Sequence, residues 1–132
     1  APYMGEVLYN CLIASDAVII PVTADRYSLQ GLSKLNETIN SIKKRFNPKL
    51  KVLGLLLVKF NSRTLLSQET RQALNSIAKD MNTKLFNTTI RTSTKAQEAQ
   101  AKRTTLIKYA PNSTTAIDYV EFTNELLAEI IT

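Results

Sequence analysis

The hydrophobic residues of this chain form three short continuous runs, which are set apart by longer segments of mixed character. The runs cover Ala17–Val22, Val52–Val58 and Leu85–Ile90, the last being weaker and rich in threonine. Apolar runs without polar alternation are typical of strands in a parallel sheet that is covered on both faces. The sequence therefore predicts three buried strands.

Between these runs, apolar residues recur every three or four positions, as in helices that pack one face on a sheet. Asn47–Pro48 should end the longest helix, because proline disfavours helical backbone in the residue before it. Other helices are expected over residues 4–14, 73–81 and 117–131. The stripes include Leu29, Leu32, Leu35, Ile39, Ile42 and Phe46 in the longest helix, and Ile117, Val120, Leu127 and Ile131 in the last.

The predicted elements alternate in the order helix, strand, helix, strand, helix, strand, loop, helix. Connections of this kind join parallel strands by right-handed crossovers and place helices on both faces of the sheet. The sequence therefore predicts a three-layer, Rossmann-like α/β fold with about three parallel strands.

Composition narrows the classes of function. The 132 residues, 44% of them hydrophobic, suit one compact domain or a piece of a larger one. With no histidine and with Cys11 as the only cysteine, Ser-His-Asp and Cys-His catalysis are excluded within this chain, and no zinc site is expected. No run of 18 apolar residues is present, so we expect a cytoplasmic protein without a membrane span.

Charge is unevenly distributed. The formal net charge of +6 favours acidic partners such as nucleic acid. Basic residues gather in residues 34–51 and 91–108, and Glu98 is the only acidic residue of the second stretch. The cations of that stretch are Arg91, Lys95, Lys102, Arg103 and Lys108.

Four segments, in order and at matching spacing, resemble the ParA/Soj family of DNA-partitioning ATPases, a deviant-Walker branch of the P-loop NTPases. They are Ala14–Val22, Asp25–Leu32, Gly54–Thr64 and Leu106–Pro111. The set is more specific than any one member. The resemblance implies a partial P-loop NTPase fold, with residues 1–132 as the C-terminal portion of the ATPase domain.

The resemblance also implies that the phosphate-binding loop and the Mg²⁺-linked aspartate of the family lie upstream of Ala1. A phosphate cradle needs closely spaced glycines, whereas Gly5, Gly31 and Gly54 are scattered. We therefore expect ATP and Mg²⁺ in a full-length ATPase, and neither bound by residues 1–132 alone. The chain by itself should have no ATPase activity.

Two positions match DNA-binding residues of the family. Arg63, in the loop after the second run, matches an arginine that contacts DNA in the ATP-bound dimer. The alternatives are a solvated loop arginine or a helix-capping neighbour of Thr64. Lys95 stands where the family has arginine, and it keeps the charge but loses the bidentate fork. Phosphate contacts need mainly positive charge, so binding can survive that change. Lys102 and Arg103 are further candidates, unless all three belong to an ordinary basic surface.

Three residues are candidates for a place near the nucleotide. Asp25 matches an acidic residue of the family, but its position also suits an N-cap for the helix that follows. Asn10 matches an asparagine of the family and could equally satisfy a backbone group. Thr92, together with Arg91, replaces the family's Pro-Arg pair, which puts the usual contact with the adenine base in doubt.

The resemblance implies an ATP-gated homodimer that binds DNA without sequence preference, associates with the nucleoid and is released with the help of a ParB-like partner. Its cargo would be a chromosome, plasmid or mobile element. One alternative is a MinD-like membrane-cycling ATPase, which would need a basic amphipathic C-terminal helix, whereas the last helix here is acidic. Another is a non-catalytic interaction module.

Overall fold

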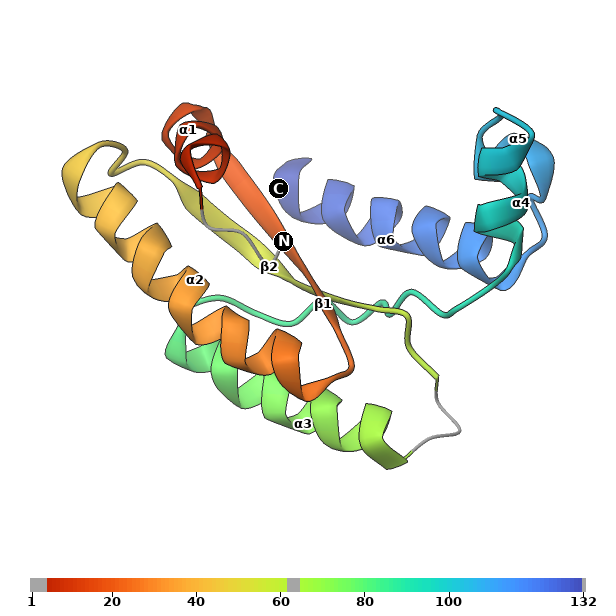
Figure 1. The fold of residues 1–132 in the computed structure, drawn as a ribbon, viewed down its shortest axis with the longest axis horizontal. Coiled ribbons are helices and arrows are strands. Elements are labelled where there is room, and N and C mark those ends of the chain that lie inside the picture. Colours follow the sequence, from red (N-terminus) through yellow and green to blue (C-terminus); the bar gives the residue numbers. More distant parts are fainter. Residues whose placement is uncertain (1–4, 62–64, 132) are drawn as a thin grey trace.

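The structure is a computed structural model and describes residues 5–61 and 65–131, the side chains of 65–67 excepted. As far as residue 80, helices and strands alternate as the hydrophobic pattern predicts (Figure 1). The helices are α1 (Glu6–Ala14), α2 (Arg26–Arg45), α3 (Leu65–Asp80), α4 (Lys95–Ala101), α5 (Leu106–Tyr109) and α6 (Thr114–Ile131), and the strands are β1 (Ala17–Thr23) and β2 (Lys51–Val58).

The two strands pair in parallel, from Ala17 opposite Lys51 to Thr23 opposite Val58. A bulge interrupts the register after Val18, so that Ile19 lies opposite Gly54. Because α2 connects the end of one strand to the start of the next, the pair forms the crossover unit that the sequence predicts. The parallel α/β architecture is confirmed.

The predicted third strand, Leu85–Ile90, is only partly formed. Residues 84–92 run beside β2, but they make isolated bridges, Leu55 with Leu85 and Phe60 with Arg91, rather than a continuous ladder. Between the bridges, the backbone N–H groups of Asn87 and Thr88 donate instead to the carboxylate of Glu125 on α6. The side chain of a helix thus takes the place of ladder hydrogen bonds in the middle of this segment.

The sheet separates two clusters of buried side chains. Ile20 and Val22 of β1, with Leu55 and Leu57 of β2, face the cluster built by α2 and α3. Ile19, Leu56 and Val58 face the other cluster, which Phe122 of α6 joins. Figure 1 shows α2 and α3 on one side of the strands and α6 on the other. The alternation is the period of two that a strand imposes on its side chains.

The C-terminal helix packs on a different face from the one its apolar stripe suggests. Ile117, Val120, Leu127 and Ile131 are between 40% and 78% exposed, whereas Ala116, Asp118 and Phe122 are buried. Phe122 packs edge-on against Phe86 with 4.9 Å between ring centroids. Asp118 and Glu125 both bind residues 87–91, and these polar contacts fix the rotation of the helix about its axis. An interpretation of the stripe as the core-facing side is therefore wrong.

The end of α2 is tied to α1 by one amide. As predicted, the helix stops just before Asn47–Pro48, and the N–H groups of Phe46 and Asn47 both donate to the carbonyl of Ile42. The side-chain Nδ2 of Asn47 then donates to the carbonyls of Leu12, Ile13 and Ser15. These carbonyls lie at the C-terminus of α1, where intrahelical partners are missing. One residue therefore closes both helix ends.

A matched pair of glycine substitutions tests the packing of β2. A Cβ atom added to Gly54 would lie 2.6 Å from Cε2 of Phe86, whereas one added to Gly31 of α2 would have no atom within 4 Å. Because Phe86 is fully buried, Gly54→Ala should lower the free energy of unfolding by about 2 kcal/mol. Gly31→Ala should raise it by about 0.5–1 kcal/mol, since alanine favours helix. Urea unfolding followed by circular dichroism measures both, and an unchanged stability of Gly54→Ala would contradict the packing.

Candidate functional site

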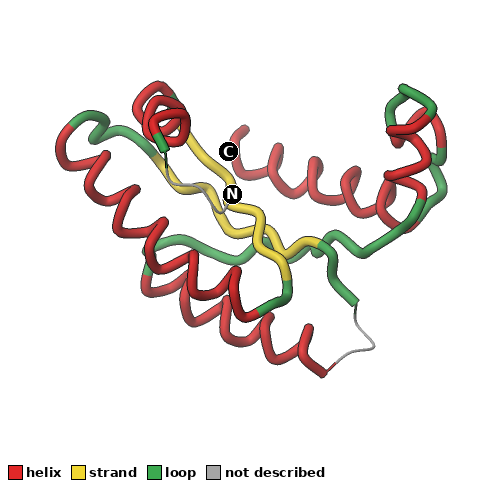
Figure 2. The backbone as a smooth tube through the Cα atoms, viewed as in Figure 1, coloured by secondary structure: helices red, strands yellow, loops and turns green. Residues whose placement is uncertain are grey.

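Three connections leave the sheet at one edge. The carboxyl ends of β1 and β2 lead into Asp25 and Asn61, and residues 84–92 end at Thr92 (Figure 2). In parallel α/β proteins, ligands bind outside the carboxyl ends of the strands. Arg63 lies outside the described residues, so its placement stays a prediction. Asp25 and Thr92 can be followed contact by contact.

Asp25 is the N-cap of α2. Its carboxylate accepts hydrogen bonds from the backbone N–H of Ser28, at 2.8 Å, from the Ser28 hydroxyl and from the Thr23 hydroxyl. The Thr23 hydroxyl, followed by the N–H of Ser28, lowers the pKa of this carboxyl below its usual range. The capping role is confirmed. Because three donors already occupy the carboxylate, it has little remaining capacity to coordinate an ion.

The residue before Thr92, Arg91, forms an ion pair with Asp118 that fixes the end of segment 84–92. The guanidinium of Arg91 donates from both Nε and Nη2 to Asp118, each at 2.9 Å, and the Arg91 backbone N–H donates to the same carboxylate at 2.8 Å. The Thr115 hydroxyl donates to the Arg91 carbonyl. Hydrogen bonding to Asp118 raises the pKa of Arg91, so this cation stays charged. The α6 helix thus sets the direction in which the chain continues toward Lys95.

Sequence reasoning did not identify Asp118. A signal was present, because an aspartate four residues before a phenylalanine falls on the same helix face as that apolar residue. Burial of a carboxylate requires a paired cation or several hydrogen bonds, and Arg91 supplies both. Arg91 is consequently engaged within the protein and contributes less than a free cation to any surface for anions.

The basic residues after Thr92 form a separate lobe, α4 with α5, at one end of the molecule (Figure 1). Lys95 begins α4, and its Nζ lies 3.5 Å from Oε2 of Glu98. Lys102 and Arg103 follow the end of α4, and Arg103 adopts a φ of 53° in the turn toward α5. The structure therefore brings Lys95, Lys102 and Arg103 together on one lobe. We call this the basic lobe, with Lys108 as its fourth exposed cation.

Asn10 is not part of this arrangement. It is exposed on α1, and α1 packs against the C-terminal half of α2, whereas Asp25 caps the N-terminus of that helix. Twenty residues of α2 span about 30 Å at the usual helical rise, so the two candidates lie far apart within this chain. If both residues do contact nucleotide, they would not contact the same part of it within this chain.

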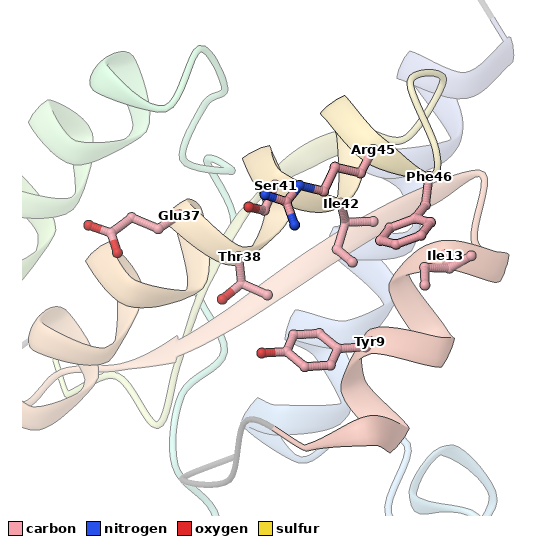
Figure 3. A pocket seen from close by; sticks show the side chains of 8 residues that line it. All are labelled: Tyr9, Ile13, Glu37, Thr38, Ser41, Ile42, Arg45 and Phe46. Atoms are coloured by element: carbon pink, nitrogen blue, oxygen red, sulfur yellow. The ribbon is translucent and has the colours of Figure 1, made fainter.

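A groove of about 510 Å³ lies between α1 and α2 (Figure 3). Figure 3 shows Tyr9 and Ile13 of α1 facing Ile42 and Phe46 of α2. The groove lies at the end of α2 remote from Asp25 and contains none of the predicted site residues. Besides these aromatic and aliphatic side chains, the groove is lined by Glu37, Thr38, Ser41 and Arg45 of α2.

Two classes of site are not found in residues 5–61 and 65–131. No group of three or more histidine, cysteine, aspartate and glutamate side chains in these ranges could hold a metal ion. No helix there is long and apolar enough to cross a membrane.

Comparison with known proteins identifies the relatives of this chain. A family model described as "AAA domain" matches residues 1–52. The chromosome-partitioning ATPase Soj of Thermus thermophilus is 30% identical over 129 residues, which are 98% of this chain and 51% of that protein. The sporulation initiation inhibitor protein Soj of Bacillus subtilis is 33% identical over 127 residues, 96% of this chain and 49% of that protein. The chain is a homologue of the Soj/ParA chromosome-partitioning ATPases.

The Soj/ParA homologue spans about half the length of these curated relatives. Among solved structures, cobyrinic acid a,c-diamide synthase from Mycobacterium smegmatis with bound ADP and magnesium superimposes with a TM-score of 0.74 at 24% identity. The match covers 99% of this chain and 45% of that one. The likeness shows that this chain shares the α/β fold of the matching part of that protein, in agreement with the fold class predicted from sequence.

Proposed function

We propose that residues 1–132 belong to a partitioning ATPase that binds DNA without sequence preference as an ATP-gated dimer, through the basic lobe and Arg63. The observation that carries the proposal is the similarity to Soj proteins over 96–98% of the chain. The exposed cations Lys95, Lys102 and Arg103 on one lobe support it, because neutralisation of backbone phosphates supplies nearly all non-specific DNA affinity.

ATP and Mg²⁺ would be bound mainly by other parts of the protein. In the described residues, Gly31 lies within α2 and Gly54 lies against Phe86, so neither contributes to a phosphate cradle. Asp25 is occupied as a cap. These residues do not fit a complete nucleotide site, and we assign no catalytic step to them. Asp25, Asn10 and Thr92 would at most border a nucleotide held elsewhere.

The cellular role that follows is segregation of a chromosome or another replicon. A ParB-like protein would stimulate hydrolysis and release the dimer from DNA, and the protein would associate with the nucleoid. The acidic α6, which ends in Glu129 and two isoleucines within the described residues, does not favour the alternative of binding to an anionic membrane surface.

Lys95→Ala in the full-length, ATP-bound protein tests the proposal. Loss of one phosphate contact should weaken binding to unrelated duplexes about equally and reduce the slope of log affinity against log salt by roughly 1. Fluorescence anisotropy with two duplexes of different sequence, at several salt concentrations, measures this. Arg63→Ala should behave in the same way.

Lys79→Ala is the matched control, because it removes the same charge from an exposed position on α3, away from the basic lobe (Figure 1). It should leave DNA affinity nearly unchanged. If Lys95→Ala binds DNA like the wild type but loses ATPase activity, Lys95 acts in hydrolysis and its assignment to DNA is wrong.

A further inference from the structure

The basic lobe contains one carboxylate, that of Glu98, and its side chain is held beside Lys95. Oε1 of Glu98 accepts a hydrogen bond from the Tyr109 hydroxyl at 3.1 Å, and Oε2 lies 3.5 Å from Nζ of Lys95. The Thr94 hydroxyl lies 3.5 Å from the same Oε2. A negative charge therefore sits between α4 and α5, directly beside the lysine assigned to DNA.

The position of this carboxylate is fixed from two sides. Tyr109 belongs to α5, so its hydrogen bond ties Glu98 to a different helix and restricts the rotamers that would carry the carboxylate away. From the other side, Nζ of Lys95 and the Thr94 hydroxyl both lie 3.5 Å from Oε2 of the carboxylate. The side chains of Lys95 and Glu98 are 48% and 42% exposed, so both are open to an approaching phosphate.

We propose that Glu98 competes with DNA phosphates for Lys95 and so limits the DNA affinity of the basic lobe. The inference rests on the proposed function. The Glu98 carboxylate already lies 3.5 Å from the Lys95 ammonium. A phosphate that approaches this ammonium therefore competes with the carboxylate for it and is also repelled by the carboxylate's negative charge. An ATPase that must leave DNA in each cycle needs weak, readily reversed contacts, and a carboxylate placed beside a contact lysine provides them.

The size of the effect follows from the separation of the charges. One unit charge about 7 Å from a phosphate, in a solvated setting, changes the binding equilibrium by roughly threefold. Salt screens charges over a Debye length of about 10 Å at 0.1 M and about 3 Å at 1 M. The effect should therefore be largest at low salt and should nearly disappear at about 0.5 M.

Glu98→Gln in the full-length, ATP-bound protein is the test, with two unrelated duplexes and fluorescence anisotropy. Its side-chain carbonyl can still accept the hydrogen bond from Tyr109, so the lobe should stay folded, and circular dichroism checks this. We expect about threefold tighter binding at low salt, equal for both sequences. Glu37→Gln is the matched control, since it removes the same charge from an exposed position on α2 and should change affinity little.

A double-mutant cycle separates competition from a change in net charge. If Glu98 acts through Lys95, the gain from Glu98→Gln should shrink in a Lys95→Ala background. An equal gain in both backgrounds, or an equal gain from Glu37→Gln, would overturn the inference and leave the DNA-binding proposal intact. If the wild type does not bind DNA, or Lys95→Ala has no effect, the proposed function itself fails and the role of Glu98 fails with it.

Discussion

Asp118→Ala should lower the free energy of unfolding by about 3 kcal/mol, because it removes a buried carboxylate that is paired with a cation and accepts several hydrogen bonds. The carboxylate is 5% exposed and accepts three hydrogen bonds from Arg91, one of them from the backbone. The Arg91 side chain is 45% exposed and can be solvated after the substitution. The loss of stability should therefore be smaller than for a fully buried ion pair.

Urea unfolding measures the loss, and hydrogen exchange locates it. The Arg91 amide should lose protection, together with the backbone that leads to Lys95, whereas amides of β1 and β2 should stay protected until global unfolding. Asp118→Asn, which retains one acceptor oxygen, should fall between the wild type and Asp118→Ala. Asp80→Ala, at the exposed end of α3, is the control for loss of an acidic residue. A stability of Asp118→Ala equal to that of the control would show that the Arg91 contacts are not formed.

Glu125→Ala should lower the free energy of unfolding by about 2–3 kcal/mol, since it removes the acceptor that replaces a strand ladder. The carboxylate binds the N–H of Asn87 at 2.8 Å, the N–H of Thr88 at 2.9 Å and the Thr88 hydroxyl at 2.8 Å. Without it, residues 87–89 must either be solvated or pair with β2. Hydrogen exchange at Asn87 and Thr88, together with urea unfolding, measures the result.

The contribution of Glu125 should depend on pH. Partial burial raises the pKa of Glu125, but hydrogen bonds from Asn87 and Thr88, with the charge of Lys84, outweigh it and hold the pKa below its usual range. A carboxyl whose pKa is lower in the folded state adds stability above its unfolded pKa, about 4.3, and loses it as the pH falls through the folded value. The stability difference between wild type and Glu125→Gln should therefore be large at pH 7 and shrink below about pH 4.

Glu121→Gln is the control for loss of an acidic residue from the same helix, because Glu121 is exposed. A stability difference for Glu125→Gln that stays constant between about pH 3 and pH 7 would mean that the carboxylate is not held by the two backbone N–H groups.

Local patterns in the sequence were sufficient for most of the helices and strands. The apolar runs at Ala17–Val22 and Val52–Val58 lie within β1 and β2, and Asn47–Pro48 follows α2 at the predicted place. Asp25 caps that helix, one of the two roles that its position allowed. These features depend on backbone sterics, helix capping and the period of burial, all of which act between residues close in the chain.

Other features required contacts between distant segments. Residues 85–90 have the composition of a strand, yet Glu125, nearly 40 residues later, binds the backbone of Asn87 and Thr88 and interrupts the ladder. The same contact, with the one between Asp118 and Arg91, turns α6 so that Phe122 meets Phe86 while Ile117 and Val120 are exposed. Helical periodicity alone cannot select between two apolar faces, because both satisfy it.

For the candidate site, too, some features could be predicted from the sequence and others could not. Residue order alone is enough to predict the parallel α/β order, the excess of cations over residues 91–108 and the lack of a glycine-rich cradle within the chain. The folded structure was needed to show that Arg91 is engaged by Asp118, that Glu98 is held beside Lys95, and that Asn10 is remote from Asp25. Charge and pattern are properties of composition and order, whereas the partner of each charged side chain depends on where the rest of the chain folds.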